Sequence, residues 1–169
     1  GVFGCCYYDE ELHAIKTTQY MIENKKDALT ILHLGKKYFQ DMYKKNKRHI
    51  VTFAGNNDFT MINYLFEKYN IDYDIKEHFT HVDLQREYEK VKKTSIGLKM
   101  LEKEFNIERE SELISGHNLA KTFAKVIKDN DYINRMPDDK KEKILLYNRQ
   151  DVVSLFYMCV NWFKIIEKE

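Results

Sequence analysis

Two side chains near the end of the sequence have the types and spacing to act together in metal binding or hydrolysis. Tyr147 and Asp151 are four residues apart in a long run without helix-breaking residues, so both fall on one face of a helix. Asp151 also lies within the arc that the apolar residues Ile144, Leu155 and Met158 occupy. Burying an ionised carboxylate without a partner costs several kcal/mol. Asp151 must therefore be paired, protonated, placed at the mouth of a cleft, or bound to a cation.

One long helix, from Pro137 to Lys168, is predicted to position this pair. Proline fits the first turn of a helix, and the carboxylates of Asp138 and Asp139 suit its positive end. Most of the apolar residues that follow recur at three- and four-residue spacing, which leaves little of the middle facing water and predicts a core helix. They are Ile144, Leu145, Leu146, Val152, Val153, Leu155, Phe156, Cys159, Val160 and Phe163.

A second acidic residue, Asp58, is predicted at the end of a strand. The apolar run His49–Ala54 predicts a buried strand, residues 55–57 a turn, and the following residues a helix that ends near Tyr69. This order places Asp58 at the C-terminal edge of a sheet, where α/β proteins tend to build sites. A helix cap is the alternative role for this carboxylate.

The remaining segments predict alternating strands and helices. Residues 9–11 are three carboxylates between two strand-like runs, and a solvated turn explains them better than a metal site does. Asp83 is expected to cap the helix that follows it, and Ser95 the next helix. The predicted elements are a hairpin of residues 1–8 and 12–20, a helix from Asn24 or Asp27 to Asn46, a strand at 80–84, helices at 85–93 and 95–105, a loop at 108–115 and a helix at 116–127.

Two of these segments resemble motifs of one enzyme family. Residues 147–155 (YNRQDVVSL) resemble the third acidic motif of the DEDDy 3′-5′ exonucleases, most closely that of the YprB-type ribonuclease H-like domains. Residues 50–65 resemble the second acidic motif, with Ala54 where the family has Asn and with the order Asp58-Phe59 reversed. The resemblance implies an α/β fold, a ribonuclease H-like mixed β-sheet flanked by helices, without its first central strand.

The same resemblance implies a chemistry. Two Mg²⁺ or Mn²⁺ ions would promote hydrolysis of phosphodiester bonds at a single-stranded 3′ end of DNA or RNA. Asp151 and Asp58 would be metal ligands, and Tyr147 would orient the attacking water. The family also places an Asp-x-Glu pair on its first, central strand, and nothing in this sequence matches that pair. We therefore expect residues 1–169 to form a single domain, a fragment of a longer chain, and to be inactive alone.

Composition limits the function further. The sequence has 28 Lys and Arg against 27 Asp and Glu, a net charge of +1, so any binding of nucleic acid must be local. Arg149, Lys121 and Lys125 are the candidate phosphate contacts. The three cysteines are interpreted as reduced residues of a cytoplasmic protein, and no apolar run is long enough for a membrane span. Two alternatives remain: a non-catalytic nucleic-acid-binding or scaffold module, and a generic α/β domain whose Asp151 is ion-paired.

Overall fold

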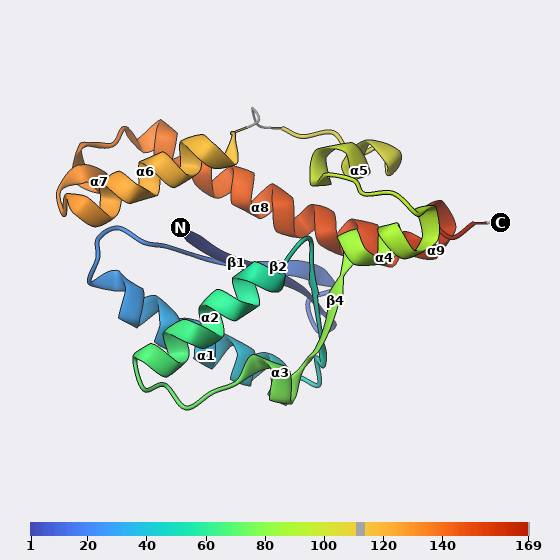
Figure 1. Cartoon of the computed structure of the whole chain (residues 1–169), viewed down its shortest axis with the longest axis horizontal. Coiled ribbons are helices and arrows are strands. Elements are labelled where there is room, and N and C mark those ends of the chain that lie inside the picture. The colour runs from blue at the N-terminus through green and yellow to red at the C-terminus, as the bar shows by residue number, and fades with distance from the viewer. Residues whose placement is uncertain (111–113, 169) are drawn as a thin grey trace. The chain divides into compact units, whose positions relative to one another are not determined.

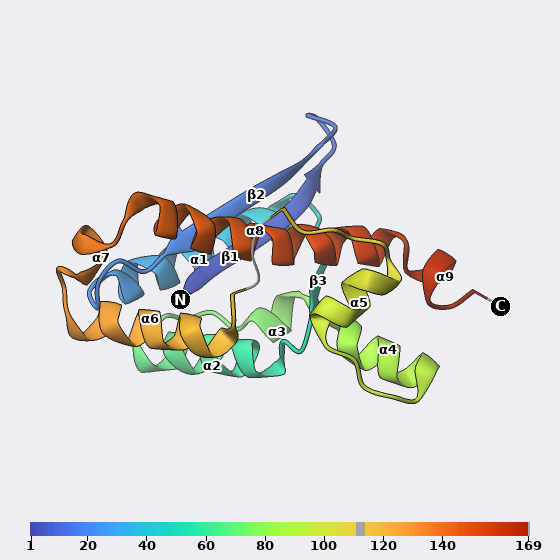
Figure 2. The ribbon, with the colours of Figure 1, turned by 90° about the horizontal axis from the view of Figure 1, so that it is seen from above.

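The structure is a computed structural model that describes residues 1–110 and 114–168, apart from the side chains of residues 56 and 57. Part of the predicted loop at 108–115 lies outside the described residues. The elements are numbered in chain order; Figure 1 labels all of them except β3, which Figure 2 labels. They are β1 (Val2–Asp9), β2 (Ala14–Met21), α1 (Asp27–Lys44), β3 (His49–Thr52), α2 (Asn56–Lys68), α3 (Ile75–His78), β4 (Thr80–Asp83), α4 (Leu84–Lys92), α5 (Leu98–Glu104), α6 (Gly116–Lys128), α7 (Tyr132–Arg135), α8 (Asp138–Val160) and α9 (Trp162–Ile165).

The chain divides into two compact units. Unit 1 contains Gly1–Ile31 and Arg109–Val153, and unit 2 contains Leu32–Glu108 and Ser154–Glu169. The helices α1 and α8 each contribute residues to both units. Unit 1 has an antiparallel pair of strands and unit 2 a parallel pair. The predicted mixed α/β class is therefore confirmed.

Unit 1 begins with the predicted hairpin. β1 and β2 pair from Val2 opposite Met21 to Asp9 opposite Ala14. The carboxylate of Asp9 accepts hydrogen bonds from the backbone N–H groups of Glu11 and Leu12, each at 3.0 Å. This carboxylate closes its own turn, as side chains of aspartate commonly do.

The core of unit 1 joins the end of the hairpin to three helices. The hydroxyl of Ser115 caps α6 by accepting from Asn118 N at 3.1 Å, and α7 connects α6 to the start of α8 (Figure 1). The short helix α7 was not predicted, because it is one turn long and has no amphipathic repeat. The buried residues of this core are Ile22, Val126, Ile133, Met136 and Ile144.

Unit 2 contains β3 and β4, paired in parallel from His49 opposite Thr80 to Thr52 opposite Asp83. β3 ends two residues earlier than predicted. Ala54, with φ 54°, adopts a left-handed conformation that a strand cannot contain. The turn that follows leads directly into α2.

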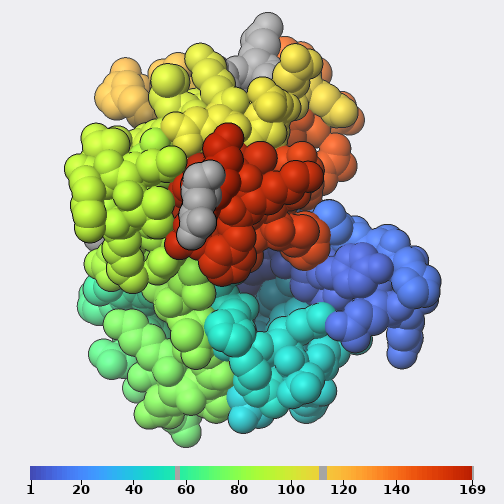
Figure 3. Space-filling view, turned by 90° about the vertical axis from the view of Figure 1, so that its right-hand side faces the viewer, coloured from blue at the N-terminus to red at the C-terminus, as the bar shows by residue number. Residues whose placement is uncertain are grey.

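The second core gathers α4, α5, α9 and the last turns of α8. Figure 2 shows these helices together near the C-terminus, and Figure 3 shows the red C-terminal residues packed against the yellow-green ones of α4 and α5. Leu101 and Met158 have no exposed surface. The buried residues of this core are Leu84, Tyr88, Leu101, Phe105, Met158, Trp162 and Ile166.

The end of the long helix differs from the prediction. α8 ends at Val160 and a separate helical turn, α9, follows. Val160 and Phe163 are 67% and 78% exposed, although both were predicted to face inward. Val160 stands two residues after the buried Met158, on the opposite side of α8. The break at Asn161 then changes the phase of the apolar repeat, so Trp162 and Ile166 enter the core in place of Phe163. A second correction concerns α5, whose N-cap is Gly97 and not Ser95.

Candidate active site

The predicted pair lies on α8 in unit 1 and contacts Arg109, a residue of the segment between α5 and α6 that was not among the predicted site residues. Tyr147 and Asp151 are both partly buried. The guanidinium of Arg109 forms an ion pair with Asp151 Oδ1, and its Cζ lies 5.0 Å from the centre of the Tyr147 ring. The Arg109 side chain is only 7% exposed, whereas that of Asp151 is 29% exposed. One cation therefore contacts both residues of the predicted catalytic pair.

The hairpin holds this stretch of α8 through hydrogen bonds. Gln19 Nε2 donates to Leu145 O and to Asn148 Oδ1, both at 2.8 Å. The thiol of Cys6 donates to Val152 O at 3.3 Å. These bonds come from both strands and reach the helix on either side of Tyr147. The hairpin thus fixes the rotation of the helix that carries the pair.

Gly4 allows the hairpin to approach the helix. A Cβ atom at this position would lie 2.1 Å from Asn148 Oδ1, far inside van der Waals contact. Asn148, the residue after Tyr147 on α8, is thus bound by the hairpin through Gln19.

Burial makes the cysteines of the hairpin weak acids. Desolvation raises the pKa of Cys5 to about 12, with a contribution from Cys6, and raises that of Cys6 to about 11. Cys159 is exposed in unit 2, and burial of its thiol raises its pKa less. Thiolates are the reactive form, so we expect Cys5 and Cys6 to react slowly at neutral pH.

We expect Ellman's reagent at pH 8 to modify Cys159 first in the native protein, and Cys5 and Cys6 only after denaturation. Because the folded pKa values are raised, the contribution of these thiols to stability is complete below the ordinary thiol pKa of 9.0 and is lost as pH rises to about 11 for Cys6 and about 12 for Cys5. Mass spectrometry of the modified peptides identifies the site. Native labelling of Cys6 as fast as Cys159 would contradict this burial.

A buried carboxylate in unit 2 organises the turn before Asp58. Asp83, 6% exposed, accepts hydrogen bonds from Ala54 N at 2.9 Å and Gly55 N at 3.2 Å. It also accepts from Gln85 N at 3.0 Å, which makes it the predicted cap of α4. One side chain therefore binds the turn after β3 to the helix after β4.

Asp58 lies in the first turn of α2, as predicted. The residue is exposed, but desolvation by the surrounding protein raises the pKa of its carboxyl group. A nearby cation would favour the ionised form again. Asp58 belongs to unit 2 and Asp151 to unit 1, and the structure describes each carboxylate within its own unit.

The three predicted phosphate contacts, Arg149, Lys121 and Lys125, are all exposed residues of unit 1. Lys125 Nζ lies 5.9 Å from the centre of the Tyr132 ring. Arg109 gave no comparable signal in the sequence, because it stands in a polar segment without periodicity or motif. Only the requirement that Asp151 have a partner pointed to a cation.

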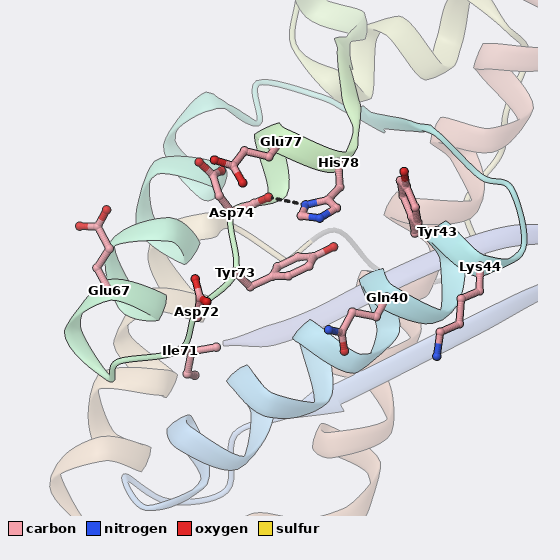
Figure 4. A pocket seen from close by; sticks show the side chains of 10 residues that line it. All are labelled: Gln40, Tyr43, Lys44, Glu67, Ile71, Asp72, Tyr73, Asp74, Glu77 and His78. Atoms are coloured by element: carbon pink, nitrogen blue, oxygen red, sulfur yellow. Dashed lines mark hydrogen bonds between the residues drawn. The ribbon is translucent and has the colours of Figure 1, made fainter.

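Unit 2 also has a pocket of about 690 Å³ between α1 and the loop leading into α3. Figure 4 shows Tyr73 in its centre, near Tyr43 and His78. The Tyr73 ring stacks on the His78 ring, with the two ring centres 4.9 Å apart. The buried hydroxyl of Tyr73 has no hydrogen-bond partner among the described residues. The side chains that line the pocket include none of those predicted for chemistry.

Comparison with known families shows one family model that matches most of the chain. The family model RNase_H_2, of the RNase H superfamily, matches residues 1–163. The chain belongs to the RNase H superfamily. The match includes α2 with Asp58 and α8 with Tyr147 and Asp151. No curated protein and no solved structure matches the chain.

Membership of the RNase H superfamily implies nuclease-like hydrolysis of nucleic acids, chemistry for which such domains typically use divalent metal ions. Asp151 suits such an ion as one ligand, because it supplies hard carboxylate oxygens from a regular helix and already binds a cationic group. Within residues 1–110 and 114–168, no three His, Cys, Asp or Glu side chains gather as a metal-binding group. The described helices also include none long and apolar enough to span a membrane.

Proposed function

We propose that this RNase H superfamily domain is a DEDDy-type 3′-5′ exonuclease of the YprB kind. Its substrate would be the single-stranded 3′ end of DNA or RNA. The observation that carries the proposal is the pair on α8: Tyr147 and Asp151 are one helical turn apart, and the carboxylate already attracts a cation. A hydroxyl and a carboxylate on one rigid element can serve the same small volume, as a hydrolytic site requires.

The proposal gives each residue a role. Mg²⁺ or Mn²⁺, when bound, would stabilise the charge on the attacking and leaving oxygens of the phosphodiester. Asp151 and Asp58 would supply carboxylate oxygens to the metal site, and Asp58 enters from the sequence resemblance and its place at the start of α2. Tyr147 would orient the attacking water. Two metal ions need more oxygen ligands than these two, and the family's Asp-x-Glu pair is the expected source.

Contacts to the phosphate backbone would come from exposed basic side chains. Arg149, Lys121 and Lys125 are accessible to a large ligand. Each would bind phosphate without reading the base, so these contacts do not distinguish DNA from RNA.

The test is the release of nucleotides from 3′-labelled single-stranded DNA and RNA in the presence of Mn²⁺. The full natural protein and its Asp151→Asn variant are compared at equal concentration. We expect the variant to release the labelled nucleotide at least about 100-fold more slowly, which corresponds to about 2.7 kcal/mol of lost transition-state stabilisation. Asparagine keeps the size of the side chain and removes the negative charge.

Asp129→Asn is the matched control. Asp129 also forms an ion pair with an arginine, Arg135, but both are well exposed, at 45% and 62%. This variant should keep the rate of the natural protein. Equal rates for the natural protein and Asp151→Asn would remove Asp151 from the mechanism.

The ion pair also favours a second function. Because Arg109 neutralises Asp151, the domain could bind nucleic acid or act as a scaffold without hydrolysing the bound strand. Binding of single-stranded DNA or RNA by the full protein, with no release of nucleotides in Mg²⁺ or Mn²⁺, would select this alternative.

A further inference from the structure

Arg109 competes for the oxygen that the proposed metal site needs. Its guanidinium is paired with Asp151 Oδ1 and lies over the ring of Tyr147. A divalent cation on the same carboxylate would be close to this positive charge, and like charges at short range repel strongly. Binding of a metal ion to Asp151 and pairing of Arg109 with Asp151 therefore oppose each other. Each weakens the other by the same factor.

The displaced guanidinium would be able to bind another anion. Arg109 is a nearly buried side chain, and hydrogen bonds to an anion are stronger in such a site than in water. A phosphate diester is a suitable replacement, because the planar guanidinium donates two parallel hydrogen bonds to phosphate oxygens. Arg109 also lies outside regular secondary structure, between α5 and α6, so no helix or strand bond fixes its backbone.

We propose that Arg109 is a substrate-binding residue of this site: its guanidinium exchanges the carboxylate of Asp151 for a phosphate of the substrate when Asp151 takes a divalent cation. This inference rests on the proposed function. It assigns the phosphate contact nearest the reaction to Arg109, whereas Arg149, Lys121 and Lys125 are exposed positions on the helices.

The first measurement is the affinity of the full protein for Mn²⁺ alone, by titration calorimetry. Arg109→Gln keeps a polar side chain and removes the competing charge, so we expect Mn²⁺ to bind about tenfold more tightly than to the natural protein. Arg135→Gln, which removes the arginine of an exposed pair with Asp129, should leave the affinity unchanged. An Mn²⁺ affinity of Arg109→Gln within twofold of the natural protein overturns the inference.

The second measurement is the affinity for a fluorescent oligothymidylate in Ca²⁺, by anisotropy. Arg109→Gln is expected to bind the oligonucleotide about tenfold more weakly, since charged hydrogen bonds of this kind contribute about 1.5–3 kcal/mol. Arg109→Lys is a second variant that tests the inference even where Arg109→Gln does not fold. It keeps the charge but not the two parallel bonds, so Mn²⁺ affinity should stay near that of the natural protein while oligonucleotide affinity falls. Unchanged oligonucleotide binding in both variants overturns the exchange.

Asp151→Asn separates this inference from the function on which it rests. If Asp151→Asn loses Mn²⁺ affinity and Arg109→Gln does not gain it, the metal site stands and the exchange by Arg109 is wrong. If Asp151→Asn binds Mn²⁺ as the natural protein does, Asp151 is not a ligand, and both proposals fail.

Discussion

Asp83→Ala should lower the free energy of unfolding by about 4 kcal/mol, because three backbone N–H groups lose one shared acceptor. Ala54, Gly55 and Gln85 all donate to this carboxylate. Each buried donor left without a partner costs about 1–3 kcal/mol. The turn before Asp58 is held by two of these bonds, so under the proposed function the nuclease activity of the full protein should fall together with stability. Urea denaturation followed by circular dichroism measures the change.

Asp74→Ala is the matched control for this effect. Asp74 caps α3 and accepts one backbone bond, from Lys76 N at 2.9 Å. Loss of a single cap costs about 1 kcal/mol. If the two alanine variants lost the same stability, Asp83 would be an ordinary cap, and the bonds to the turn would contribute nothing measurable.

Gly4→Ala should destabilise the protein by about 3 kcal/mol, because the added methyl group overlaps Asn148. Its Cβ would lie 2.1 Å from Asn148 Oδ1, and overpacking of this kind typically costs about 1–3 kcal/mol. Relief requires the amide to rotate, which breaks its 2.8 Å bond from Gln19. The hairpin and α8 would separate at the place where Tyr147 is positioned. The same denaturation experiment reports the loss.

Two further variants isolate the cause. In Gly116→Ala the new Cβ meets nothing within 4 Å, so this change inside α6 should be neutral or slightly stabilising. In the double variant Gly4→Ala with Asn148→Ala the overlap is gone. Its loss of unfolding free energy should therefore be smaller than the sum of the losses in the two single variants. Strict additivity would show that the close approach of Gly4 to Asn148 is unimportant.

The sequence predicted those features that depend on local pattern. Apolar periodicity located α8 and its buried middle, and the acidic run at residues 9–11 gave the hairpin turn. Asp83 was recognised as a helix cap, because aspartate before a helical run commonly has that role. Its bonds to Ala54 and Gly55 were not predictable. They join residues 28 and 29 positions apart in sequence, which only the pairing of β3 with β4 brings together.

Arg109 shows the same limit for the candidate site. The burial of Asp151 required a partner, and the sequence left its identity open among several choices. Arg109 stands 42 positions before Asp151, in a segment without a repeat, so no spacing rule connects them. A contact that depends on the path of a loop cannot be inferred from a helical pattern.

Ala54 stands where the motif it resembles has asparagine, and its backbone conformation disfavours alanine. Its φ of 54° is left-handed, a conformation that asparagine and glycine adopt more readily than alanine. An asparagine would suit this backbone better, and here alanine adopts it with its N–H bonded to Asp83.

The path of the chain constrains how this protein can be dissected. It leaves unit 1 inside α1 at Leu32, returns at Arg109, and leaves again inside α8 at Ser154. No single proteolytic nick releases either unit as one continuous peptide. The first and last crossings lie inside the helices α1 and α8, whose backbone hydrogen bonds therefore involve residues of both units. Expression of one unit alone would require two peptides or an engineered joint, and unravelling of α8 in one unit would remove hydrogen bonds from the other.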